Sequence, residues 1–206
     1  MVNLERGFKS WSERCAVSLR RELGIKPSDP LSVQALAGYL EIELLTPKDV
    51  PGLPTECLDQ LLKKDRDGWS ALTILQDRHH TIIYNPRHSV GRQSSDIMHE
   101  LAHIIMEHEP SKLILSPDGS VIMRTFDQKQ EDEAAWLSGC LLLPRETLLH
   151  IRRSGASEHV ICQQYRVAPT MLKYRIQKTG VDRQLRFTQI RRTSPGKKVS
   201  SSAGTG

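Results

Sequence analysis

The stretch His99-Glu100-Leu101-Ala102-His103 determines how the rest of this chain can be interpreted. Two histidines four positions apart lie on one face of an α-helix, one turn from each other, so both imidazoles can bind the same metal ion. Apolar residues recur around them at helical spacing, which predicts a largely buried helix; they are Ile97, Met98, Leu101, Ile104 and Ile105. The stretch therefore predicts a metal site on a core helix.

Glu100 stands between the two histidines and is expected to lie beside the bound metal. Neutral imidazole is a good ligand for Zn²⁺, and zinc with an open coordination position lowers the pKa of a bound water to about 7. A carboxylate beside that water can accept its proton and later pass it to a leaving group. We therefore expect His99 and His103 to be zinc ligands and Glu100 to be a general base.

A second helix is predicted over residues 130–144, with a proline at its end. Small residues at i+3, i+4 and i+7 from Glu131 share its face and allow another helix to approach closely; they are Ala134, Ala135 and Ser138. A carboxylate on that face could complete a His₂Glu site with water in the fourth position. Glu133 lies about 200° away around the helix, so Glu131 is the preferred third ligand and Glu133 the alternative.

Residues 92–108 and 131–144 together resemble the ImmA/IrrE family of bacterial metallopeptidases. That family carries an arginine, here Arg92, shortly before a HELxH helix, and a later helix of the form Glu-x-(Glu/Gln)-Ala-(Asn/Asp)-x-Phe-Ala-x-x-Leu-Leu-Met-Pro. Residue by residue, the family's third ligand falls on Glu131. The chain departs from the pattern at the Asn/Asp position, which is Ala135, and at the Phe-Ala pair, which is Leu137-Ser138.

The resemblance implies a zincin-like α+β fold, with helices around a small, mostly antiparallel sheet. It also implies a regulatory zinc endopeptidase whose protein substrate is often a helix-turn-helix transcriptional repressor. The competing hypothesis is a zinc-stabilised, non-proteolytic regulator that binds DNA or another protein, in which a cysteine or further histidine would close the fourth metal position. A toxin-like protein controlled by a partner is a third possibility that the sequence does not separate from the first.

Alternating apolar residues predict paired strands over 69–75 and 81–84, joined by a polar turn that contains His79 and His80. A further strand is predicted over 41–45, and a second hairpin around Pro117-Asp118-Gly119. A strand just before an HExxH helix resembles zincin peptidases, in which an edge strand pairs with the extended substrate.

Residues 157–165 and 170–178 predict two helices joined by a tight turn, a spacing that suits a helix-turn-helix over 157–178. Basic residues on the second helix would suit DNA phosphates; they are Lys173, Arg175 and Lys178. An αα-hairpin that packs against the catalytic core is the favoured alternative.

The length of 206 residues and a hydrophobic content of 38% suit one domain, which we expect over 1–189. Residues 190–206 are basic and too polar to pack, so we expect a disordered tail there. No signal-peptide segment and no run of 18 apolar residues is present, so we expect a cytoplasmic protein without a membrane span. The scattered cysteines should be reduced and mostly buried; they are Cys15, Cys57, Cys140 and Cys162.

His108 follows His103 by five positions, so it lies off the ligand face and is expected to cap the C-terminal end of the helix.

A hydrolase also needs a group that stabilises negative charge on the attacked carbonyl. The candidates for that role are Arg92, His150, Tyr165 and Arg175.

Overall fold

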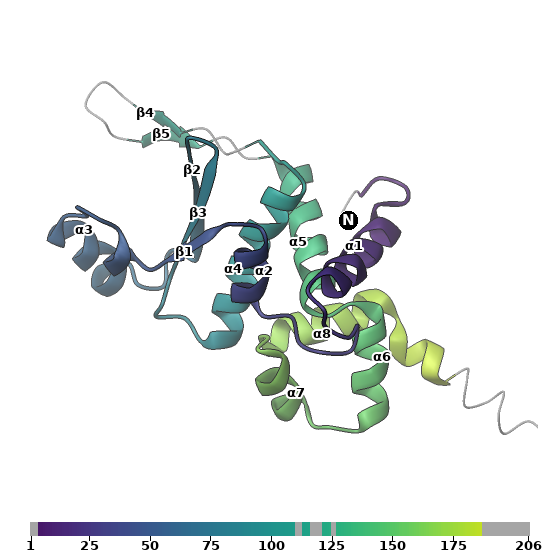
Figure 1. Cartoon of the computed structure of the whole chain (residues 1–206). Helices are drawn as coiled ribbons and strands as arrows, with labels where there is room; N and C mark the ends of the chain where they lie inside the picture. Colours follow the sequence, from purple (N-terminus) through teal and green to yellow (C-terminus); the bar gives the residue numbers. More distant parts are fainter. Residues whose placement is uncertain (1–3, 110–112, 116–120, 125–126, 187–206) are drawn as a thin grey trace, which may run out of the picture.

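The computed structural model describes residues 4–109, 113–115, 121–124 and 127–186. Within these ranges the chain is rich in helix and carries two small sheets (Figure 1), in agreement with the predicted α+β class. The helices are α1 (Phe8–Glu22), α2 (Val33–Tyr39), α3 (Thr55–Asp59), α4 (Val90–Ile105), α5 (Gln128–Leu142), α6 (Arg145–Ser154), α7 (Glu158–Tyr165) and α8 (Pro169–Thr179), with short helical turns η1 (Pro47–Asp49) and η2 (Gln60–Lys64).

The main sheet contains β1 (Glu43–Leu45), β2 (Ala71–Gln76) and β3 (His79–Tyr84) in the order β1-β3-β2. β2 and β3 form the predicted antiparallel hairpin, whereas β1 runs parallel to β3 over a shorter stretch, so the main sheet is mixed rather than wholly antiparallel. The long connection through α3 makes the parallel pairing possible, because parallel strands need a crossover while a tight turn joins antiparallel ones. A second, antiparallel pair consists of β4 (Leu113–Leu115) and β5 (Val121–Arg124); its predicted turn lies outside the described residues.

Asp77 and Arg78 alone form the turn of the β2–β3 hairpin. Both have positive φ angles, 47° and 69°, as a type I′ turn requires to match the twist of its strands. Gln76 therefore pairs directly with His79. The five-residue polar turn predicted from the sequence is too long, and His79 and His80 belong to β3.

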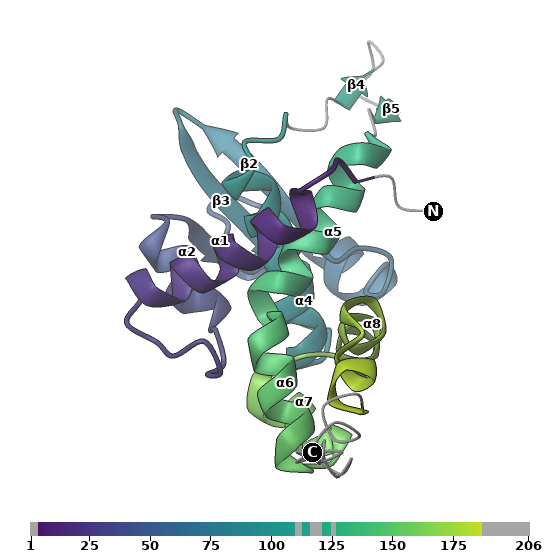
Figure 2. The same cartoon turned by 90° about the vertical axis from the view of Figure 1, so that its right-hand side faces the viewer.

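Helix α4 lies between the sheet and α5 (Figures 1 and 2). Most of its predicted apolar face is fully buried, at Ile97, Met98 and Leu101 together with Ala102. Ile104 and Ile105, at the end of the helix, are partly buried against the core. Burial of each larger side chain contributes roughly 1.5–3 kcal/mol, so α4 is firmly fixed in the core. Helix α5 is buried along its second half and crosses α1 on its other side (Figure 2).

Two fully buried arginines hold the C-terminal end of α5. Arg20 donates from Nη2 to the carbonyl of Leu142 at 3.3 Å, and Arg175 donates from Nε to the carbonyl of Leu143 at 3.1 Å. These carbonyls lack partners within the helix, and the negative end of the helix dipole favours a cation there. Burial lowers the pKa of Arg20 to about 10, which still leaves it charged at neutral pH.

Glu13 on α1 balances one of these buried charges. Its Oε1 accepts a hydrogen bond from Arg175 Nη2 at 2.6 Å, and its Oε2 accepts one from the backbone N–H of Arg145 at 2.8 Å. One carboxylate therefore joins α1, the start of α6 and α8 around the end of α5. Removing one partner of a buried ion pair is costly because the other charge is left unpaired.

Helices α7 and α8 follow each other across a tight turn, as predicted, and α8 packs against α5 and α6. The basic face predicted for DNA phosphates is not assembled on α8. Arg175 is fully buried, Lys173 lies 3.7 Å from Glu158, and Lys178 lies over an aromatic ring of its own helix. These contacts favour the αα-hairpin that packs against the core.

Three expectations concern the chain as a whole. The four cysteines are free thiols, but only Cys140 is buried and Cys57 on α3 is exposed, so the expectation of mostly buried thiols is wrong. α3 buries none of its residues, which explains the exposure of Cys57. Among the described residues, no helix is long and apolar enough to cross a membrane. The predicted tail over 190–206 lies outside the described residues.

We predict that Glu13→Ala lowers the free energy of unfolding by about 3 kcal/mol, because it leaves the buried charge of Arg175 without a partner. This value is at the low end for a buried pair because Glu13 is partly exposed. Chemical denaturation measures it. Glu5→Ala is the matched control, since it removes the exposed pair with Lys129 and should leave the midpoint unchanged. Equal midpoints for the two variants would contradict the anchoring role of Glu13.

Candidate metal centre

The C-terminal end of α4 places His108 beside His103. Glu107 adopts a positive φ of 53° and reverses the chain after the helix. The N–H of His108 then donates to the carbonyl of His103, and that of Glu107 to the carbonyl of Ile104, both at 3.0 Å. This hydrogen-bond pair is a Schellman motif. The expected cap is therefore formed by the backbone of His108, and its imidazole is free to make a different contact.

His99, His103 and Glu131 converge between α4 and α5. The two histidine Nε2 atoms lie 3.1 Å apart, His99 Nε2 lies 3.0 Å from Glu131 Oε2, and His103 Nε2 lies 3.6 Å from Glu131 Oε1. All three side chains are half-buried. In the described part of the chain they form a group of possible metal ligands whose donor atoms lie within 4.8 Å of one another.

The spacing of these donor atoms fits zinc. In a tetrahedral site with bonds of 2.0–2.1 Å, neighbouring ligand atoms lie about 3.3 Å apart, close to the observed separations of 3.0, 3.1 and 3.6 Å. Burial lowers the pKa of His103 to about 4, with the charge of His99 acting in the same direction, so its imidazole is neutral at neutral pH. The neutral form is the one that binds a metal ion. Two imidazoles and a carboxylate are also a donor set that zinc accepts.

His108 and Glu133 form a hydrogen-bonded chain behind His103. His108 Nδ1 lies 2.9 Å from His103 Nδ1, and His108 Nε2 lies 3.4 Å from Glu133 Oε2. An ionised carboxylate only accepts, so His108 carries its hydrogen on Nε2 and accepts on Nδ1. His103 then donates from Nδ1 and keeps the lone pair of Nε2 directed at the cluster. Metal-binding histidines are typically oriented by such a partner on the ring nitrogen away from the metal.

Glu131 and Glu133, the two alternatives for the third metal ligand, make different contacts. Glu131 lies within the cluster, whereas Glu133 lies behind it, with a side chain only 13% exposed. The helical face argued from the sequence placed Glu131 with the small residues of α5. The indirect link from Glu133 to His103 was not foreseen, because it depends on the chain reversal at Glu107.

Glu100 is held by a residue that the sequence analysis missed. Thr73 on β2 donates from its hydroxyl to Glu100 Oε2 at 2.6 Å, across the contact between α4 and the sheet. Glu100 is half-buried and does not belong to the group of converging donor atoms. The only sequence signal for Thr73 was a hydroxyl that interrupts the apolar run of β2. The contact uses one of the two carboxylate oxygens of Glu100.

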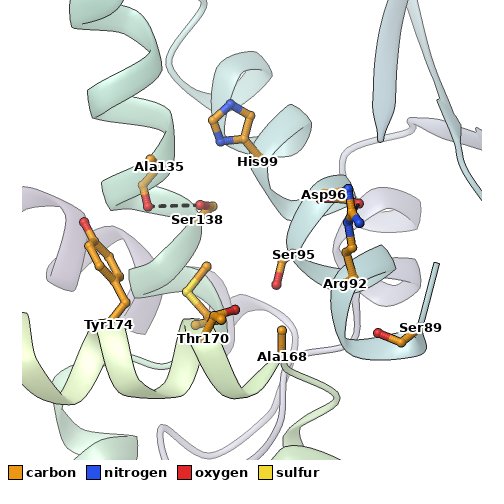
Figure 3. Close-up of a pocket in the computed structure, with 11 residues that line it drawn as sticks. Ser89, Arg92, Ser95, Asp96, His99, Ala135, Ser138, Ala168, Thr170 and Tyr174 are labelled. Carbon is orange, nitrogen blue, oxygen red and sulfur yellow. Dashed lines mark hydrogen bonds and ion pairs between the residues drawn. The ribbon is translucent and has the colours of Figure 1, made fainter. Parts of the chain in front are cut away.

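The candidates for oxyanion stabilisation are placed very differently. Tyr165 donates to the carbonyl of Ser28 at 2.8 Å, Arg175 is buried at the end of α5, and His150 is exposed on α6. Arg92 belongs to the first turn of α4 and lines a pocket that His99 also lines (Figure 3). Tyr174, which the sequence analysis did not consider for this role, lines the same pocket.

Residues 59–177 match the family model of the IrrE N-terminal-like domain, Peptidase_M78. The match spans more than half of the chain and includes both α4 and α5 with the whole cluster. The chain belongs to the ImmA/IrrE family of metallopeptidases. Membership of this family implies a metal, and the His99–His103–Glu131 group is a place in this chain where it can bind.

No curated protein gives a significant match to this ImmA/IrrE chain. Among solved structures, a Mycobacterium tuberculosis transcriptional regulator aligns with a TM-score of 0.44 and 12% sequence identity. The alignment covers 84% of this chain and 48% of that protein, so this chain spans about half of the regulator's length. A likeness this weak carries no argument about what the chain does.

We predict that metal affinity ranks the two glutamates. Glu131→Ala should abolish tight zinc binding, whereas Glu133→Ala and His108→Leu should each weaken it by about 10–100-fold, the usual effect of losing a group that orients a ligand. Competition with a chromogenic chelator measures the affinity. Glu146→Ala, an exposed carboxylate on α6, is the control and should bind as tightly as wild type. A larger loss for Glu133→Ala than for Glu131→Ala would reverse the assignment.

Proposed function

We propose that this protein is a zinc-dependent endopeptidase. The observation that carries the proposal is the triangle of donor atoms from His99, His103 and Glu131, whose edges of 3.0, 3.1 and 3.6 Å suit one tetrahedral ion. Three protein ligands leave the fourth position for water or substrate, as catalytic zinc requires. Membership of a metallopeptidase family supports the same chemistry. In this proposal the three residues hold the ion and Glu100 is the general base.

The reaction is hydrolysis of a peptide bond. When bound, zinc would acidify a water ligand and polarise the scissile carbonyl. Glu100 accepts a proton from the attacking water on a carboxylate oxygen, while the hydrogen bond from Thr73 keeps the carboxylate in place. Glu100 then delivers that proton to the amide nitrogen of the leaving segment. The C–N bond breaks, the two products share the elements of water, and the carboxylate is regenerated.

The alternative of a zinc-stabilised, non-proteolytic regulator has less support. A structural zinc site normally has four protein ligands. In the described residues the cluster has three, all from His and Glu. Buried Cys140, a possible fourth ligand by residue type, lies instead with its Sγ 3.6 Å from Glu13. An open position therefore fits the described cluster better than a closed one.

We further propose that the substrate is a protein, with a helix-turn-helix repressor as the class that the ImmA/IrrE resemblance implies. β2 supports the binding of an extended segment, because it is an edge strand of the main sheet and carries Thr73 beside Glu100. An extended peptide can add to such an edge through backbone hydrogen bonds that make little demand on its sequence. Free thiols throughout the chain fit a reducing compartment, and we propose the cytoplasm.

We predict that Glu100→Gln binds zinc as tightly as wild type but loses turnover by about 10²–10⁴-fold, the contribution of a positioned general base. Mass spectrometry of a peptide mixture incubated with the zinc-loaded protein measures cleavage. Glu146→Gln on α6 is the matched control and should cleave normally. Full turnover in Glu100→Gln would refute its role as the base. Absence of cleavage by the wild type would favour the non-proteolytic regulator.

A further inference from the structure

A pocket of about 600 Å³ opens beside the candidate metal centre. It lies between α4, α5 and the start of α8, with His99 at one side (Figure 3). One wall comes from α4, where Arg92, Ser95 and Asp96 precede His99 by one to two turns. A bound substrate whose scissile bond lies at the metal would therefore extend a neighbouring side chain into this pocket.

The opposite walls combine small and apolar residues with two larger residues that carry a hydroxyl, Thr170 and Tyr174. Helix α5 contributes Ala135 and Ser138, and the start of α8 contributes the rest; these residues are Ala168, Thr170, Met171 and Tyr174. Ala135 stands where the family pattern has Asn or Asp. The shorter side chain leaves space and removes a polar group from the wall that faces α4.

Two of the hydroxyls on the walls are already engaged in hydrogen bonds to the backbone. Ser138 donates its hydroxyl to the carbonyl of Ala135 at 3.1 Å (dashed line in Figure 3), and Ser95 donates to the carbonyl of Gly91 at 3.0 Å. A serine hydroxyl has one donor, so neither side chain can donate to a ligand without losing its bond to the backbone. These two hydroxyls therefore add little polarity to the pocket.

The charges on the α4 wall also balance each other. Asp96 lies 3.0 Å from Nδ1 of nearly buried His88 and 3.8 Å from Nε of Arg92. Arg92 reaches Ser70 as well, at 3.4 Å. An acidic substrate side chain would be attracted by the guanidinium of Arg92 but repelled by the adjacent carboxylate of Asp96. A basic side chain would be attracted by Asp96 but repelled by Arg92. Neither sign of charge gains a clear partner, whereas an apolar side chain gains burial.

We propose that this pocket binds a bulky apolar side chain, such as Leu, Met or Phe, next to the bond that is cleaved. The inference rests on the proposed peptidase function and names the kind of cleavage site that it selects. The volume is in the range of well-formed ligand pockets, so it admits such a side chain together with part of the adjoining residue. Selection by an apolar pocket is moderate, in the range of about 10–200-fold for a change in side-chain size.

The test compares cleavage of peptides that carry either a bulky or a small side chain on each side of one bond. The zinc-loaded wild type should prefer Leu, Met or Phe over Gly at one flanking position by at least about 10-fold. Ala135→Leu fills the pocket and should lower this ratio to near one. Ala168→Leu fills it from α8 and should do the same, which covers the case in which one variant fails to fold. Ala35→Leu, at an exposed position on α2, is the matched control and should keep the ratio.

Binding without turnover separates this inference from the proposed function. Fluorescence anisotropy with labelled Leu- and Gly-containing peptides on zinc-loaded Glu100→Gln should show the same preference, and Ala135→Leu in that background should remove it. If the wild type cleaves nothing while this binding preference holds, the peptidase proposal fails and the pocket stands. An unchanged preference in both pocket variants would overturn the inference. So would a preference for acidic side chains that Arg92→Gln abolishes.

Discussion

The close approach of α4 and α5 is the constraint on which the rest of the structure depends. His99 and His103 extend from α4, and the Glu131 carboxylate must reach within 3.0 and 3.6 Å of their Nε2 atoms from the other helix. Small side chains on the Glu131 face make this possible, and two of them, Ala134 and Ser138, are almost completely buried. Larger residues at these positions would separate the helices and pull the carboxylate away from the imidazoles. The close packing of α4 against α5 is therefore also what brings the three candidate ligands together.

The ends of the two helices are held by contacts that fix the cluster before any ligand binds. Asp127 accepts hydrogen bonds from the first free N–H groups of α5, and Arg20 and Arg175 satisfy carbonyls at its other end. Gly139 lets Arg175 pass closely, since a Cβ there would lie 2.7 Å from its Cδ. On α4, the reversal at Glu107 brings His108 onto the ring of His103. Such supporting contacts keep a site close to its working geometry.

The helices and the members of the cluster could be predicted because they follow from periodicity within single elements. The 100° step of the helix places His99 with His103 and sets Glu131 on the same face as small residues. What the sequence missed depends on chain reversals and tertiary contacts. Thr73 meets Glu100 across 27 positions, and the parallel pairing of β1 depends on where the connection through α3 returns. From the sequence, Arg175 was a candidate for binding DNA phosphates. Only the packed structure shows that its guanidinium pairs with the carboxylate of Glu13.

X-ray absorption at the zinc edge of the purified, zinc-loaded protein tests the central claim most directly, because it reports the ligands of the ion itself. The account predicts four nitrogen or oxygen neighbours at about 2.0–2.2 Å, two of them with the outer-shell scattering of imidazole, and no sulfur at about 2.3 Å. In His103→Ala one imidazole contribution should disappear. A sulfur neighbour, or an imidazole count that is the same in His103→Ala and the wild type, would contradict the assignment of the metal to His99, His103 and Glu131.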